Sequence, residues 1–75
     1  MEFRYRGNGF WSANRHLNGW TLVFKIMRHG DDEFTTELWV DSKHEAAGES
    51  ESYVDAVNLA DDMLYNWISG VDEEE

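Results

Sequence analysis

The sequence predicts an α+β fold, a small two-layer sandwich in which one helix covers one face of an antiparallel sheet. Two observations lead to this prediction. Up to residue 41, apolar and polar side chains alternate in runs, as they do in strands. Residues 52–69 instead repeat their apolar side chains at helical spacing. The chain has 75 residues without an internal repeat, so we expect a single domain over 1–70 and a flexible acidic tail at 71–75.

Three strands are expected, near residues 2–6, 20–28 and 33–41. In the first, Phe3 and Tyr5 alternate with charged residues. The second is the clearest, because one face is fully apolar and the other partly so, which indicates a central strand. The third repeats the alternation and is rich in β-branched and aromatic residues. Together the three runs predict a sheet of about three strands.

Glycine, asparagine and aspartate mark the turns between these strands. Residues 7–9 read Gly-Asn-Gly, and Asn18-Gly19 is a second turn sequence. Residues 10–19 fit either a strand or an aromatic-bearing loop. Residues 29–33 are expected to form a hairpin turn in which Gly30 supplies a positive φ angle.

Two helical segments are expected after the strands. A short helix is predicted at residues 43–47, because Ser42 with Glu45 three residues later fits a capping box. The main helix is predicted over 52–69, starting at an N-capping serine and ending at Gly70. Its apolar stripe consists of Tyr53, Ala56, Val57, Ala60, Met63, Leu64, Trp67 and Ile68.

The charge is strongly negative and unevenly distributed. The net charge is −10, with +4 in residues 1–30 and −14 in residues 31–75. Such a surface opposes binding to nucleic acid or anionic lipid and favours basic partners. No apolar run approaches the ~20 residues of a membrane span, and no secretory signal is visible at the N-terminus. We therefore expect a cytoplasmic protein (in the host cytoplasm if phage-encoded) that does not bind membranes or nucleic acid directly.

The acids of the second half predict a partner-binding surface. On the main helix they lie opposite the apolar stripe, and residues four apart are separated by ~6 Å along the helix axis. This is close to the separation of successive phosphates along a DNA strand. The same acids would also fit a solvated helix face or an adaptation to high salt. The residues expected to bind a partner are Glu45, Glu49, Glu51, Asp55, Asp61 and Asp62, with Trp39 as an apolar anchor.

These features predict a non-enzymatic protein that inhibits or modulates a nucleic-acid-handling partner by occupying its basic groove. The expected partner is a basic nucleic-acid-binding protein or complex. In size, acidity, aromatic content and lack of cysteine, the chain resembles small anti-CRISPR and anti-restriction proteins of phages and mobile elements. The resemblance is one of composition, because no residue motif carries it.

Two other functions fit parts of the sequence. The first is a self-associating module, a homodimer, that uses the sheet face without a helix. There Val23, Met27 and Trp39 would form an apolar patch, unless residues 10–19 cover it. The second is single-strand nucleic-acid binding through cations and stacking aromatic rings of the N-terminal third. Those residues are Arg4, Tyr5, Arg6, Trp11, Arg15, Trp20, Lys25 and Arg28.

Catalytic chemistry is not expected. The chain has no cysteine nucleophile, and its serines lie in no nucleophile-elbow sequence. His29 and His44 lie beside acids but not at the spacing of a zinc or calcium motif. We therefore predict no catalytic residue, no metal and no cofactor.

Overall fold

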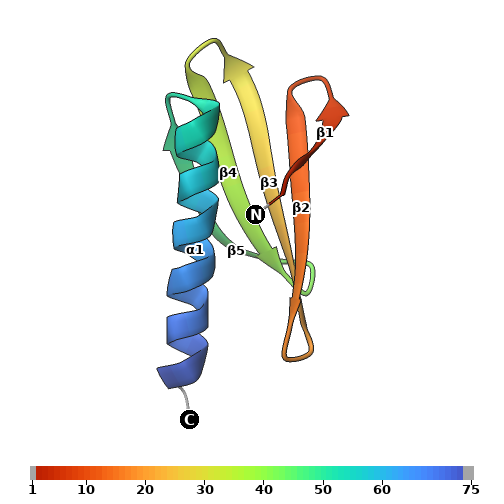
Figure 1. Cartoon of the computed structure of the whole chain (residues 1–75), viewed down its shortest axis with the longest axis vertical. Coiled ribbons are helices and arrows are strands. Elements are labelled where there is room, and N and C mark those ends of the chain that lie inside the picture. The colour runs from red at the N-terminus through yellow and green to blue at the C-terminus, as the bar shows by residue number, and fades with distance from the viewer. Residues whose placement is uncertain (1, 74–75) are drawn as a thin grey trace.

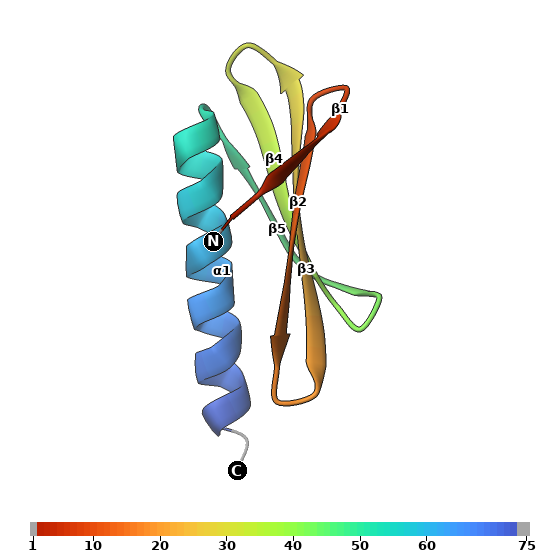
Figure 2. The same cartoon turned by 45° about the vertical axis from the view of Figure 1, so that its right-hand side comes forward.

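A computed structural model describes residues 2–73, which form one five-stranded antiparallel sheet and one helix. The helix forms a second layer against one face of the sheet (Figures 1 and 2). The α+β class is therefore confirmed, although the sheet has five strands instead of about three. The elements are β1 (Arg4–Gly7), β2 (Phe10–Leu17), β3 (Trp20–Gly30), β4 (Glu33–Val40), β5 (Lys43–Ser50) and α1 (Tyr53–Glu73).

Each strand pairs with the next in sequence, so the sheet order is β1-β2-β3-β4-β5. Two of the connections are two-residue turns in which both residues have positive φ, at Asn18-Gly19 (50° and 86°) and Asp41-Ser42 (50° and 68°). This conformation matches the right-handed twist of the flanking strands. The turn predicted at residues 7–9 is also confirmed, since all three residues have positive φ. Local sequence therefore predicts the reversals at residues 7–9 and at Asn18-Gly19, but not the one at Asp41-Ser42.

The ambiguous residues 10–19 form β2 and the turn that follows it, and not a loop over the sheet. Every residue of β2 pairs with β3, from Phe10 opposite Met27 to Leu17 opposite Trp20. Trp11 points to the helix side, where its ring packs against the rings of Phe34 and Tyr53. β2 therefore extends the sheet and leaves the opposite face uncovered.

The short helix predicted at residues 43–47 is wrong, because this segment belongs to strand β5. The two-residue turn before it reverses the chain, so that its backbone groups pair with those of β4. An isolated helical turn is unstable in water despite the good helix propensity of the Glu-Ala-Ala sequence. The sheet pairing offers several backbone hydrogen bonds at once, and α1 then covers Ala46 and Gly48 on one side of the strand.

Gly30 does not have the predicted positive φ angle. β3 continues to Gly30, and the turn itself is Asp31-Asp32. The Arg28 side chain holds this turn, because its Nε donates to the Gly30 carbonyl (3.0 Å) and its Nη2 to Asp31 Oδ1 (2.9 Å). An irregularity in the β3–β4 register between Arg28 and Gly30 accompanies these contacts. The arginine therefore stabilises the turn that the sequence attributed to glycine.

Helix α1 begins as predicted but ends later. The backbone N–H of Asp55 donates to Ser52 Oγ (3.1 Å), which is the expected N-cap contact. The helix does not end at Gly70, because a glycine ends a helix when it adopts positive φ, and Gly70 does not. The first three residues of the predicted tail therefore belong to the helix, and residues 74–75 lie outside the described part of the chain.

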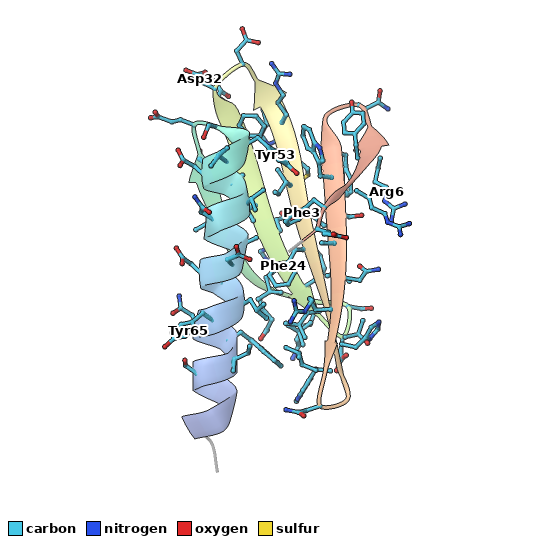
Figure 3. The ribbon with its side chains drawn as sticks, in the orientation of Figure 1. Phe3, Arg6, Phe24, Asp32, Tyr53 and Tyr65 are labelled. Atoms are coloured by element: carbon cyan, nitrogen blue, oxygen red, sulfur yellow. The ribbon has the colours of Figure 1, made fainter. Side chains whose placement is uncertain are left out.

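The core lies between α1 and the sheet, where the helix packs mainly on β4 and β5. Ala56 and Ala60 are fully buried, and such small side chains let the helix approach the sheet closely. The buried hydroxyl of Thr36 donates to the Ala56 carbonyl (3.2 Å) and links the two layers. Phe3 packs against the same core beside the helix, as Figure 3 shows. The remaining buried side chains of the sheet are Ala13, Leu22, Phe24, Ile26, Phe34, Leu38 and Val40.

Gly48 is expected to be required for close packing of β5 against α1. A Cβ atom at this position would lie 2.7 Å from Leu59 Cδ2 and 3.5 Å from Met63 Cε. Gly48→Val should therefore lower the free energy of unfolding by about 1–3 kcal/mol, although valine is a better strand residue than glycine. Urea unfolding followed by circular dichroism measures the change.

The matched control is Ala47→Val, one residue earlier and exposed on the other side of β5. It should change the unfolding free energy by less than about 0.5 kcal/mol. Equal stabilities of the two variants would contradict the close approach of Leu59 to this strand.

Candidate functional site

Six exposed acids of the second half form what we call the acidic surface. They come from β5, from its junction with α1 and from α1 itself. β5 is an edge strand that runs from the β4–β5 turn, which lies away from α1, to the start of the helix (Figure 2). The ladder register places Glu49 beside Thr35 on the sheet face without the helix. The residues of the acidic surface are Glu45, Glu49, Glu51, Asp55, Asp61 and Asp62.

The packing of α1 determines which of its residues face outward. Its apolar stripe is directed to the sheet, and this leaves Asp55, Asp61 and Asp62 exposed. Two apolar side chains are exposed with them, Tyr65 (72%) and Val54 (66%). Tyr65 points away from the sheet in Figure 3 and lies within four residues of both mid-helix aspartates. The sequence analysis missed Tyr65, although its position outside the apolar stripe indicates exposure.

The β3–β4 turn adds two more acids at one end of the molecule. Asp32 and Glu33 line a hollow of about 250 Å³ together with Glu49, Ser50 and Glu51. Figure 3 shows Asp32 at the tip of the turn, near the start of α1. This proximity could not be predicted from sequence, because it follows from the pairing of β5 with β4. The negative charge therefore continues from the helix to the end of the sheet.

The acids of the acidic surface have no basic partner in the part of the chain that the structure describes. Within that part, the one ion pair joins Arg28 Nη2 to Asp31 Oδ1 at 2.9 Å, and both side chains are exposed. An exposed pair of this kind contributes about 0–1 kcal/mol. The cations of the N-terminal third therefore do not neutralise the acids of the second half by direct pairing.

Trp39 does not lie on the acidic surface. It points from β4 to the sheet face turned away from α1, which we call the open face. Its Nε1 donates to Glu37 Oε1 (3.1 Å), and its ring lies tilted beside the ring of His44 (5.1 Å between centroids). Lys25 Nζ lies over the Trp39 ring, 4.7 Å from its centroid. The structure thus separates the predicted apolar anchor from the helix acids by the thickness of the sheet, and it places Glu49 on the same sheet face as Trp39.

In the basic N-terminal third, the exposed ring that lies between cations in sequence is Tyr5, which is 60% exposed between Arg4 and Arg6. Trp11 packs on the helix side, and Trp20 meets Trp67 edge-on at 5.6 Å between ring centroids. The arginines instead line a polar hollow of about 710 Å³ beside β1 and β2. Its lining contains no aromatic ring and consists of Glu2, Arg4, Arg6, Ser12, Ala13, Asn14 and Arg15. This separation disfavours a surface on which bases stack between cations.

Residues 2–73 contain no group of three histidine or acidic side chains placed to hold a metal ion. Their one helix is not apolar enough to cross a membrane. Fold and surface together define a small α+β domain with an acidic surface. The described cations form no ion pair with the acids of this surface. Comparisons with protein-family models, with curated proteins and with solved structures found no match to this chain.

Proposed function

We propose that this protein is a non-enzymatic binding protein whose acidic surface occupies a basic, nucleic-acid-binding groove of a partner protein. One observation carries the proposal. Six exposed acids lie on β5, on α1 and at their junction, and no described cation pairs with them. Their charge is therefore available to a partner, where desolvated charges need opposite charges to face them.

The spacing of the helix acids suits a groove that normally holds phosphates. Asp55 and Asp62 are two turns apart, about 10 Å along the helix axis, and Glu51 extends this row before the helix begins. Asp61 lies within the same span, about 100° around the helix from Asp62. Tyr65 is the apolar contact that such a surface offers in place of Trp39, since exposed tyrosines are enriched among residues that dominate binding energy. The acids would steer the approach of the partner and align it on the acidic surface, and Tyr65 would pack against it locally.

In its finer form, the proposal is that the protein acts as a DNA mimic of the anti-CRISPR or anti-restriction type. It would then inhibit a host nucleic-acid-handling complex in the cytoplasm by competing with DNA or RNA. Its acidity, its small size and the lack of ion pairs between its acidic surface and the described cations support this form. The mechanism is occupation of the groove and includes no chemical step.

Affinity capture with two matched variants tests the proposal. In the first, Glu51, Asp55, Asp61 and Asp62 become the corresponding amides. In the second, the same change is made at four acids off the acidic surface, so that the net charge of both variants is equal. The control positions are Glu2, Asp31, Glu37 and Asp41.

We expect wild type and the control variant to retain the same basic nucleic-acid-binding protein from lysate and to release it in a salt step. The first variant should lose it. Nucleic acid added to the lysate should compete with the captured protein for its groove. Equal capture by all three proteins, or capture that nucleic acid does not reduce, would refute occupation of a groove by the acidic surface.

A further inference from the structure

The open face carries rows of side chains that cross the sheet from strand to strand. The ladder registers place Val23, Trp39 and His44 in one such row, which begins at Asn14 on β2. The neighbouring row crosses all five strands and consists of Arg4, Ser12, Lys25, Glu37 and Ala47. β2 lies beside β3 and not over it, so no described segment covers these rows (Figure 2).

The charges on the open face balance, unlike those of the whole molecule. The two rows, with the next row from Phe10 to Glu49, contain the cations Arg4 and Lys25 and the acids Glu37 and Glu49. Arg6, which donates to Ser12 of the second row, and Asp41, which lines the groove beside Trp39, add one charge of each sign. The net charge of the chain is −10, so the excess of acids lies elsewhere. Two copies of this protein therefore repel each other least when their open faces meet.

Trp39 is held in a fixed orientation at the centre of this face. Its contacts with Glu37, Lys25 and His44 come from three strands, and its side chain remains partly exposed. A shallow apolar groove of about 580 Å³ runs beside it. The groove is lined by Thr21, Val23, Lys25, Trp39, Asp41 and Ser42. The face therefore carries a projecting ring next to a groove. In a two-fold dimer the ring of each copy can enter the groove of the other, which makes the contact self-complementary.

Lys25 and Glu37 are direct cross-strand neighbours, yet they form no ion pair with each other. The Lys25 ammonium lies over the Trp39 ring, and Glu37 accepts from the indole N–H. Each charge therefore lacks a full opposite charge within its own protomer. A second molecule packed on the open face could supply a carboxylate to pair with Lys25 and a cation to pair with Glu37.

We propose that the open face binds a second copy of this chain, about a two-fold axis parallel to the strands and midway between β3 and β4. This axis places β3 over β4 of the partner subunit while positions along the strands are kept. Lys25 then faces Glu37 of the partner subunit, and Val23 faces Trp39 of the partner subunit. Each contact occurs twice, and sheets packed in this aligned way lie about 10 Å apart.

The outline of the molecule sets an upper limit on the area that such a dimer can bury. The molecule measures 42 × 19 × 19 Å, so one long side has an outline of 42 × 19 Å, or about 800 Å². A standard protein–protein interface buries about 800 Å² on each partner. Tryptophan and methionine, which Trp39 and Met27 supply here, are enriched in such interfaces. The proposal uses the sheet face opposite α1 and does not depend on the function proposed for the acidic surface.

A charge-swap experiment tests the axis. Sedimentation equilibrium should give a wild-type mass that rises with concentration from that of a monomer to that of a dimer. Lys25→Glu alone and Glu37→Lys alone should each weaken the dimer at least about tenfold, because like charges then meet twice. The double variant Lys25→Glu/Glu37→Lys should return to within about threefold of wild type, because opposite charges again face each other.

Two controls separate this contact from net charge. Lys43→Glu and Asp61→Lys change the net charge as the two single swaps do, but these side chains do not lie on the open face, and both variants should dimerise like wild type. Circular dichroism confirms that every variant is folded. Wild-type protein that stays monomeric up to about 1 mM would overturn the proposal. A dimer that the single swaps leave intact, or that the double swap does not restore, would overturn it as well.

Discussion

Phe24→Ala is expected to remove a large part of the protein's free energy of unfolding. Phe24 is the largest fully buried side chain and lies on β3 between the sheet and α1 (Figure 3). Replacing a buried phenylalanine by alanine costs about 3–5 kcal/mol, because apolar contacts are lost and a cavity remains. A domain of 75 residues has a total stability of roughly 4–11 kcal/mol. A single substitution can therefore remove most of the stability.

Urea unfolding followed by far-ultraviolet circular dichroism measures this loss. The matched control is Tyr65→Ala, which removes an aromatic ring of similar size from a position that is 72% exposed. Its unfolding free energy should stay within about 0.5 kcal/mol of wild type. If Phe24→Ala lost less than about 1 kcal/mol, the core would not be centred between β3 and α1 as described.

Neutralising the acidic surface is expected to slow association with a captured partner by about ten- to a hundredfold at low salt. Charged surfaces raise association rates by focusing the approach of an oppositely charged partner, and this effect falls as ionic strength rises. Changing Glu51, Asp55, Asp61 and Asp62 to amides should therefore lower the association rate constant and flatten its dependence on salt. Stopped-flow mixing over a range of salt concentrations measures both.

The variant neutralised at Glu2, Asp31, Glu37 and Asp41 is the control for this measurement. Its association rate should fall much less, because the same net charge change lies off the acidic surface. Equal losses in the two variants would show that net charge alone attracts the partner. The acidic surface would then have no special role in recognition.

The helix acids and the open face lie on opposite sides of the sheet, so the two proposals can be tested separately. In a dimer joined through the open faces, both helices lie on the outside, so each copy would keep Asp55, Asp61 and Asp62 accessible, while Glu49 lies on the open face itself. Lys25→Glu should then weaken the dimer and leave a single acidic surface intact. If the partner offers two grooves within reach, dimerisation would also raise the apparent affinity through avidity.

The sequence alone determined the central hairpin and the outward face of the helix. In β3 and β4, alternation with a period of two decides which side chains are buried, and Leu22, Phe24, Leu38 and Val40 are buried as this pattern predicts. Helical periodicity likewise predicts that Asp55 and Asp62 are exposed, because the apolar stripe must face the sheet. Both patterns are local, so no knowledge of the partner element is required.

Only the tertiary structure decided the identity of β5 and the distribution of the site residues. β5 carries small side chains, Ala46 and Gly48, at its helix-facing positions, and their fit becomes visible only with Leu59 above them. Its local sequence therefore favoured a helix, while pairing with β4 made it a strand. The same pairing brings Asp32 beside Glu51 and places Trp39 on the far side of the sheet from the helix acids. These residues become neighbours because segments far apart in the sequence pair with each other. A short stretch of sequence contains no information about that pairing.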